Sequence, residues 1–224
     1  MNIPQFESDS PLFTWQNQIW EWLPNRSLFH PDSNSLFLSD FHIGKADSFQ
    51  RAGINMPRVK SQNQINLFFD FIQEKNIKQV FILGDLLHGP TTIETKHFLT
   101  LLKPLNHIRF HWILGNHDSR SAHLFGLDIA HFKQEKVSLW NGILLCHEPK
   151  KDKDLPFICG HIHPGIRLPL GAKQSIRTAC GIVSENQLIL PAFGSLTGLN
   201  IQTPAPLTNY YIFTANQVLK FSFI

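Results

Sequence analysis

LFLSDFH, at residues 36–42, joins a short apolar run to a carboxylate and an imidazole. The same change occurs twice more, where the run at 80–83 leads to Gly84-Asp85 and the run at 143–146 leads to His147-Glu148. Apolar runs of this length are typical of buried strands, and in a parallel sheet the loops after such strands meet at one edge. The pattern therefore predicts a parallel-type sheet that gathers polar side chains at the ends of its strands.

Two further clusters of metal-binding side chains complete the series: Gly115-Asn116-His117-Asp118 and Gly160-His161-Ile162-His163. The clusters offer oxygen and imidazole ligands without thiolate, which suits Mn²⁺, Fe²⁺ or Zn²⁺. Two such ions about 3.5–4 Å apart clamp the attacking and leaving oxygens of a phosphoryl displacement. Each cluster alone is also compatible with an ordinary turn or loop. The five together predict a binuclear metal-dependent phosphoesterase.

The elements between the clusters indicate an α/β fold. Apolar residues at helical spacing predict a helix over 59–75, a second helix is expected over 91–102, and a short helix plus loop is expected over 120–132. The predicted strands are 35–39, 79–83, 109–114, 137–140, 142–146, 157–159, 178–183, 187–190, 209–215 and 217–222, with hairpin turns at Glu185-Asn186 and Ala215-Asn216. Two packed mixed sheets with helices outside would satisfy this pattern.

Length and composition fit a single globular domain over residues 1–224, with 42% hydrophobic and 17% charged residues. Residues 1–34 are expected to form an aromatic-rich N-terminal extension packed on the domain. No apolar stretch approaches the roughly 18 residues of a membrane span. The first ten residues lack the basic flank and apolar core of a signal peptide, so a cytoplasmic location is expected.

The cysteines and the net charge narrow the possible partners only slightly. Cys146, Cys159 and Cys180 stand apart in apolar surroundings, so we expect buried thiols and no disulfide framework. The formal charge of +3 permits a polyanionic partner without requiring one.

Spacing within the clusters suggests how the ligands are divided. Asp40 and His42 are two residues apart, which in an extended strand end places both side chains on one side, toward one metal. By the same spacing, His161 and His163 can reach one ion each. Asp85 has two carboxylate oxygens with which it could bridge two ions. The candidate metal ligands are Asp40, His42, Asp85, Asn116, His147, His161 and His163.

The residues beside these ligands receive other roles. His117 cannot easily face the same ion as Asn116, so we expect it to point into the pocket and to donate a proton to a leaving alkoxide. Asp118 is expected to hold the tautomer of His117 and raise its basicity. Glu148 is expected to be solvated or to lie behind the ligands. His88 either approaches the substrate or is an ordinary loop histidine.

The five clusters, read as D-x-H, GD, GNH[ED], H and GHxH, resemble the calcineurin-like metallophosphoesterase superfamily across roughly 36–163. The resemblance implies a four-layer α/β/β/α sandwich with two sheets. It implies one metal held by Asp40, His42, Asp85 and His163, and a second held by Asp85, Asn116, His147 and His161. It also implies that His117 is the acid for the leaving group.

Longer stretches resemble the bacterial ligase-associated DNA-damage-response endonuclease family PdeM. They are SDFHIGKA at 39–46 with RAGI at 51–54, CHEP at 146–149 and LPAFGSLTG at 190–198. This resemblance implies a Mn²⁺-dependent phosphodiesterase or DNA endonuclease associated with a DNA ligase and a helicase. The family usually has Leu at the position of Phe41, which should face the core. Residues 192–198 are expected to form a strand and glycine turn near the pocket.

The expected chemistry is hydrolysis of a phosphodiester by a hydroxide between the two metals, with His117 protonating the leaving group. Lys45, Arg51 and Arg58 follow the first ligand pair and either contact substrate phosphates or are solvated loop charges. One alternative is a small-molecule phosphoesterase that acts on cyclic nucleotides or on a nucleotide-sugar pyrophosphate. The pyrophosphatases of lipid A synthesis usually have arginine at the position of His117, which counts against them. A non-catalytic scaffold of the same fold is the other alternative.

Overall fold

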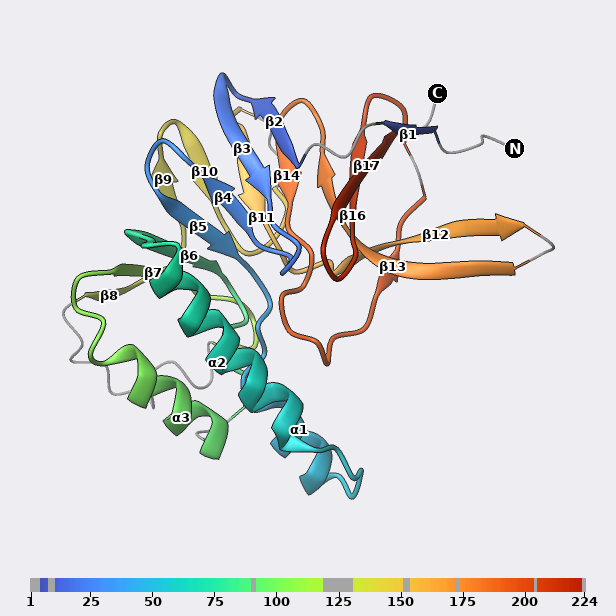
Figure 1. The fold of residues 1–224 in the computed structure, drawn as a ribbon. Coiled ribbons are helices and arrows are strands. Elements are labelled where there is room, and N and C mark those ends of the chain that lie inside the picture. The colour runs from blue at the N-terminus through green and yellow to red at the C-terminus, as the bar shows by residue number, and fades with distance from the viewer. Residues whose placement is uncertain are drawn as a thin grey trace.

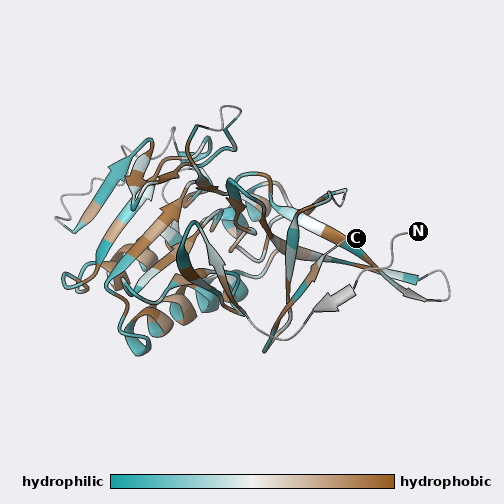
Figure 2. Cartoon of the chain, turned by 90° about the horizontal axis from the view of Figure 1, so that it is seen from above, coloured by the Kyte–Doolittle hydropathy of each residue, from teal (hydrophilic) through white to brown (hydrophobic). Residues whose placement is uncertain are grey.

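The computed structural model describes residues 5–7, 11–89, 92–118, 131–150, 154–171, 174–203 and 205–222. Within these residues two β-sheets pack face to face, with helices along the outer face of one of them (Figure 1). The fold class is therefore the predicted α/β two-sheet sandwich. Figure 2 shows hydrophobic residues concentrated along the strands in the middle of the molecule.

The seven-stranded sheet has the order β2-β3-β4-β5-β6-β7-β8. Its first strands pair antiparallel, whereas β5 to β8 are parallel. Parallel pairing brings the loops that follow β5, β6 and β7 to one edge. The strands are β2 (Leu12–Trp15), β3 (Gln18–Trp22), β4 (Leu28–His30), β5 (Ser35–Leu38), β6 (Gln79–Leu83), β7 (Arg109–Ile113) and β8 (Phe132–Glu135).

The ten-stranded sheet follows the path β1-β17-β16-β13-β14-β11-β10-β9, and β12 and β15 attach through β13. Its central strands β10, β11 and β14 are parallel, so the loops after β10 and β11 also share an edge. The strands are β1 (Gln5–Glu7), β9 (Ser138–Trp140), β10 (Ile143–Leu145), β11 (Phe157–Cys159), β12 (Pro164–Gly171), β13 (Gln174–Val183), β14 (Gln187–Ile189), β15 (Asn200–Ile201), β16 (Asn209–Phe213) and β17 (Val218–Ser222).

Helices α1 (Lys45–Arg51), α2 (Arg58–Glu74) and α3 (Ile93–Leu102) lie on the side of the seven-stranded sheet (Figure 1). The expected spacing on α2 is confirmed, because Ile65, Phe68, Phe69 and Ile72 are buried in one cluster with β5, β6 and β7. The second helical layer of a four-layer sandwich does not occur among the described residues. On the ten-stranded sheet, apolar residues of β13, β16 and β17 instead share a cluster with Ile166 and Leu168 of β12.

Several elements differ from the sequence prediction, each for a physical reason. Residues 12–30 are three strands of the sheet, so the aromatic-rich segment is an integral part of it: Trp20 and Trp22 are fully buried between the sheets. Helix α1 was not predicted, because seven residues are too few to show a clear apolar period. Strand β12 was missed because Pro164, Gly165 and Pro169 argue against a strand.

The predicted hairpin turns and buried cysteines are confirmed. The two hairpin turns at Glu185-Asn186 and Ala215-Asn216 join antiparallel strands as predicted. All three cysteines are buried, and none of them forms a disulfide bond. The helix expected over 120–132 falls largely on residues outside the described ones, although Phe132 begins β8. None of the described helices is both long and apolar enough to span a membrane.

Candidate metal centre

The polar clusters lie together in the loops after β5, β6, β7, β10 and β11. Backbone hydrogen bonds connect the loops after β5 and β6: Asp40 N–H donates to Gly84 O (3.0 Å), and His42 N–H donates to Asp85 O (2.9 Å). The backbone here is not extended. Five candidate ligands have left-handed conformations, with φ between 46° and 71°: Asp40, His42, Asp85, His161 and His163.

This conformation corrects the argument from alternate residues on a strand. Asp40 and His42 lie beyond the end of β5, and left-handed turns rather than a strand pleat direct their side chains. L-residues other than glycine rarely adopt positive φ, so the surrounding packing must hold these turns. Strain of this kind gathers at functional sites.

One group of donor atoms consists of Asp40, His42 and His163, whose ligand atoms all lie within 4.8 Å of one another. His163 Nε2 is 3.2 Å from Asp40 Oδ1 and 3.4 Å from His42 Nε2. Asp40 is fully buried, and its Oδ1 has no hydrogen-bond partner. A buried carboxylate oxygen that faces two imidazole nitrogens fits a divalent cation, since leaving it without a partner would be costly.

The second group consists of Asp85, His147 and His161. His147 Nε2 lies 3.5 Å from Asp85 Oδ2, 3.1 Å from His161 Nδ1 and 3.1 Å from Asn116 Oδ1. Asp85 Oδ2 is also 3.9 Å from His42 Nε2 in the first group. Asp85 therefore lies between the two groups, and Asn116 is at the second.

The charges in this cluster perturb its histidines in opposite directions. Burial, together with the charge of Lys45, lowers the pKa of His42 to about 3. Burial would also lower the pKa of His147, but the hydrogen bond with Asp85 and the charge of Asp40 raise it to about 9. Burial opposes ionisation of Asp85, yet its contacts with His147 and His117 lower its pKa to about 2. Two buried carboxylates thus create a strongly negative site, which favours cations.

Three glycines of the clusters leave space that the ligand side chains occupy. A Cβ on Gly84 would overlap the ring of His147, and one on Gly115 would overlap the carboxylate of Asp85. A Cβ on Gly160 would overlap Ser39 and Asp40. Each glycine therefore precedes one ligand in the chain and makes room for another from a different loop.

His117 lies at the open side of the two groups. Its backbone N–H donates to Asp85 Oδ1 (2.9 Å), and its side chain is 45% exposed with Nε2 at 4.0 Å from Asp85 Oδ2. The ring centroids of His42 and His88 are 5.3 Å and 5.1 Å from its own. His88, for which a role was left open, thus belongs to the same cluster. Its place three residues after Asp85 was the only signal.

Comparisons with known proteins assign this arrangement to a family. The family model of the calcineurin-like phosphoesterases matches residues 34–187, which contain all seven candidate ligands. The chain belongs to the calcineurin-like phosphoesterase family. It is a metal-dependent phosphoesterase, as the sequence predicted. No curated protein matches the chain.

One solved structure shares the fold over nearly the whole chain. The phosphoesterase is similar to the nuclease MPE of Pseudomonas putida, with a TM-score of 0.72 and 24% identity, over 93% of this chain and 96% of that one. Lower TM-scores relate it to a protein of unknown function from Aquifex aeolicus (0.39, 20% identity, 58% and 78% of the chains) and to the phosphoesterase Yfce from E. coli (0.41, 17% identity, 80% and 86%). At 24% identity the likeness to MPE concerns the fold alone.

Asp118 of the phosphoesterase differs from its expected role. Its Oδ1 accepts from the N–H of Leu87 (2.9 Å), and its Oδ2 accepts from Gly115 N–H (2.9 Å) and from Trp112 Nε1–H (3.0 Å). The carboxylate is fully buried and makes no hydrogen bond to His117. Its position in sequence suggested a partner for His117, but in the turn it points inward and joins the loops after β6 and β7.

Sequence reasoning missed the residues that hold the ligands in place. Ser39 Oγ–H lies 2.6 Å from Asp40 Oδ2 and 2.8 Å from Leu83 O, and Asp40 Oδ2 also accepts from His161 N–H (3.0 Å). His147 Nδ1 is 2.9 Å from Leu83 O, which favours a proton on Nδ1 and leaves Nε2 free to bind metal. The hydroxyl at the strand end was the available signal for Ser39.

Residues 192–194 support the first ligand loop from the other sheet. Phe193 N–H donates to Ser39 O (2.9 Å), and Gly194 N–H donates to Asp40 O (3.0 Å). Gln64 of α2 holds the same segment by bonding Phe193 O and Ser195 N–H. Phe193 packs on Phe41, which is buried as expected. The segment thus carries no candidate ligand but fixes the loop that does.

The basic residues after the first ligand pair have different surroundings. Lys45 is half-buried, and burial lowers its pKa although Asp40 and Asp85 lie close enough to oppose the shift. Arg58 forms an ion pair with the buried Asp47, which gives it a structural partner. Arg51 is exposed. Glu148 is also exposed, in agreement with a solvated position.

Proposed function

We propose that this phosphoesterase is a Mn²⁺-dependent phosphodiesterase that cuts DNA. The observation that carries the proposal is the pair of donor groups with Asp85 between them and His117 on their open side. The choice of DNA is supported by the sequence stretches shared with ligase-associated endonucleases and by the fold of a bacterial nuclease. The donor set of oxygen and imidazole without thiolate supports Mn²⁺.

The ligands divide by geometry into two sets. Asp40, His42, Asp85 and His163 would hold one ion. Asp85, Asn116, His147 and His161 would hold the other. Two divalent ions at these residues would supply an activated water of lowered pKa and would neutralise charge on the phosphoryl oxygens.

The chain's own side chains then position and protonate the substrate. His117 would donate the proton to a leaving oxygen from this place, because its backbone is fixed on Asp85 while its side chain is 45% exposed. Lys45, half-buried near Asp40 and Asp85, supplies positive charge at the same place.

The diesterase proposal is tested by comparing bis-p-nitrophenyl phosphate with p-nitrophenyl phosphate. Chelator-stripped protein is reconstituted with Mn²⁺, and Asp85→Ala serves as the inactive control. We expect hydrolysis of the diester alone, lost by a factor of about 10³ or more in the control, since several kcal/mol of charge stabilisation depend on the ions. DNA nicking is then assayed with the same samples. Preferential cleavage of the monoester would support a small-molecule phosphoesterase instead, and no turnover of either would support a scaffold.

The role of His117 is tested by the dependence on the leaving group. His117→Ala should lower the rate by about 10²–10⁴ for a substrate that leaves as an alkoxide, such as DNA. The loss should be much smaller for a nitrophenolate, which leaves without a proton. Equal losses for both substrates would show that His117 does not act as the acid.

A further inference from the structure

Strands β12 and β13 form a two-stranded arm that begins at the metal centre. Pro164, the first residue of β12, directly follows His163 of the first donor group. Figure 1 shows the arm extending away from the body of the sandwich. Among the described residues, β15 pairs with β12 only at its first two positions, and the other neighbours of β13 pair with it only from Cys180 onward. The outer part of the arm is therefore paired only within itself.

Two arginines lie directly opposite each other on this arm. Arg167 of β12 is the register partner of Arg177 of β13, so both side chains point to the same face. Both are exposed, and neither forms an ion pair with a described residue. Like charges opposed across two strands destabilise the pair. An anion between the guanidinium groups would remove that repulsion.

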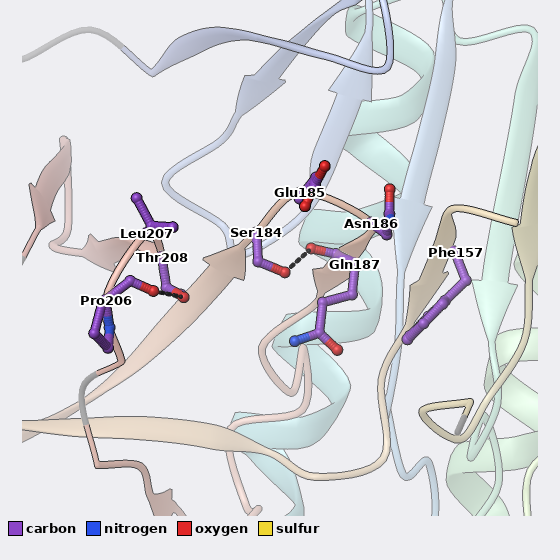
Figure 3. Close-up of a pocket in the computed structure, with 8 residues that line it drawn as sticks. All are labelled: Phe157, Ser184, Glu185, Asn186, Gln187, Pro206, Leu207 and Thr208. Carbon is purple, nitrogen blue, oxygen red and sulfur yellow. Dashed lines mark hydrogen bonds between the residues drawn. The ribbon is translucent and has the colours of Figure 1, made fainter. Parts of the chain in front are cut away.

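The surrounding sequence contains no compensating acid. From Leu155 to Ser184 there is no aspartate or glutamate, so both strands of the arm lack negative charge. The nearest acid beyond the arm, Glu185, lies at the opposite end of β13 in a shallow pocket with Asn186 and Thr208 (Figure 3). In that pocket Thr208 Oγ donates to Pro206 O, and Ser184 Oγ to Gln187 O. That end of β13 is thus acidic and internally bonded, whereas the arm presents free positive charge.

The arginine pair lies a short distance along β12 from the loop of the metal centre. Gly165 lies on the same face as Arg167 and is covered by Leu199, since a Cβ there would lie 2.9 Å from Leu199 Cβ. Asn200, the next residue, donates its N–H to His163 O (3.0 Å). Arg167 lies four residues beyond His163, or about 13 Å at the usual strand rise. That length equals roughly the axial rise of four base pairs of B-DNA, at about 3.4 Å of helix axis for each phosphate of one strand.

We propose that Arg167 and Arg177 form a backbone-phosphate site for a nucleic-acid strand whose cleaved bond lies at the metal centre. This proposal rests on the proposed phosphodiesterase function and extends it to the size of the substrate. A nitrophenyl diester is too short to reach the arm, whereas a polynucleotide spans both sites. The site would bind DNA through its phosphate charges and independently of base sequence, since phosphate contacts position a strand without identifying its bases.

An alternative structural reason for the arginines is protection of an exposed sheet edge against pairing with another chain. That reading predicts that their removal changes association between copies of the protein and not the affinity for DNA. One experiment can therefore distinguish phosphate binding from protection of the sheet edge.

The experiment measures kcat/KM for an oligonucleotide of about 20 nucleotides and for bis-p-nitrophenyl phosphate, with the Mn²⁺-reconstituted protein over a range of salt concentrations. For Arg167→Gln/Arg177→Gln we expect the slope of log kcat/KM against log salt for DNA to fall by about 1.4–1.8, at about 0.7–0.9 for each lost contact. Hydrolysis of the nitrophenyl diester should stay within about twofold. Arg167→Lys/Arg177→Lys should restore most of the slope, because it keeps both charges.

The matched control is Lys78→Gln/Arg109→Gln. Both residues are exposed and begin or precede β6 and β7, at the ends of these strands opposite to the metal centre. This variant removes the same net charge and should leave the slope for DNA unchanged. An equal fall in both double variants would show an effect of net charge, and would overturn the arm site.

The remaining outcomes separate this proposal from the one on which it rests. If the wild-type protein and Arg167→Gln/Arg177→Gln cleave DNA with the same salt slope, the arm site alone is overturned. If the variant then differs from the wild type only in the molecular mass of its assembly in solution, protection of the sheet edge is favoured. A wild-type protein that hydrolyses the nitrophenyl diester but neither binds nor cleaves DNA would overturn the nuclease function together with the arm site. An equal loss of kcat/KM on both substrates would show that the arginines act by supporting the metal centre and not by binding DNA phosphates.

Discussion

The metal centre and the tryptophan-rich core between the sheets are built by opposite means. At the metal centre, buried carboxylates and imidazoles lie on left-handed turns, with glycines making room for ligands of other loops. In the core, Trp15, Trp20 and Trp22 extend from regularly paired strands and pack on aromatic rings. The first arrangement stores strain, and the second provides apolar burial that can hold it.

The two regions depend on each other because each donor group combines both sheets. Asp40, His42 and Asp85 follow strands of the seven-stranded sheet, whereas His147, His161 and His163 follow strands of the ten-stranded sheet. The core sets the distance between these strand ends. Trp22, for example, packs so closely on Gly181 of β13 that a Cβ there would lie 2.6 Å from the ring. Binding of metal and packing of the sheets should therefore stabilise the same state.

The largest effect on stability should come from Trp20→Ala. Trp20 is fully buried, contacts the rings of Trp15, Phe37 and Trp140, and donates its Nε1–H to Trp15 O. We expect the free energy of unfolding to fall by about 3–5 kcal/mol. Denaturant titration with and without Mn²⁺ measures it, and the metal should recover part of the loss by binding only the folded state.

A milder variant separates packing from chemistry in the same region. Trp20→Phe keeps an aromatic ring and should cost less than Trp20→Ala, while turnover per folded molecule stays near that of the wild type in both. If either variant lost turnover while fully folded, the core would contribute to the geometry of the metal centre beyond holding the sheets together.

Gly115→Ala should have a smaller effect, and mainly on metal binding, whereas Trp20→Ala mainly affects folding stability. The added methyl group would displace the Asp85 carboxylate, which lies between both donor groups. We expect Mn²⁺ affinity to fall by about 10–100-fold, as it does when groups that orient ligands are lost. The metal-free protein should lose stability as well, because the Cβ would also overlap the backbone nitrogen of Asp85. Isothermal titration with Mn²⁺ measures this. Gly198→Ala is the control, because a Cβ there meets no atom within 4 Å; equal losses would exclude crowding of Asp85 as the cause.

The sequence predicted the region of the metal centre better than its local geometry. Apolar runs followed by ligands correctly located β5, β6 and β10, because burial of a whole strand leaves a clear mark on composition. The candidate ligands do lie together. Spacing alone, however, placed Asp40 and His42 on an extended strand end, whereas both adopt positive φ. A left-handed turn held by contacts from other loops has no local sequence signature when the residue is not glycine.

Elements held by distant partners were also missed. β12 contains two prolines, which are tolerated because it is an edge strand and Pro164 is its first residue. β2 and β3 were assigned to an extension because their aromatic residues did not reveal that they join β4 and β5 in one sheet. Ser39 acts through Asp40 and Leu83, a contact that only the folded loops create.

Asp118→Asn should have the smallest effect and concerns the contact between the metal centre and the core under the helices. The carboxylate accepts from Leu87, Gly115 and Trp112, so it links the metal loops to the indole of Trp112, which is buried with residues of α2 and α3. The amide keeps one acceptor oxygen but turns its NH₂ toward an N–H donor, which should cost about 1–2 kcal/mol of unfolding free energy. If Asp118 only braces the loops, turnover of a nitrophenyl diester and of DNA should fall by the same small factor. A selective loss on DNA, like that of His117→Ala, would instead show that Asp118 acts through His117, as the sequence first suggested.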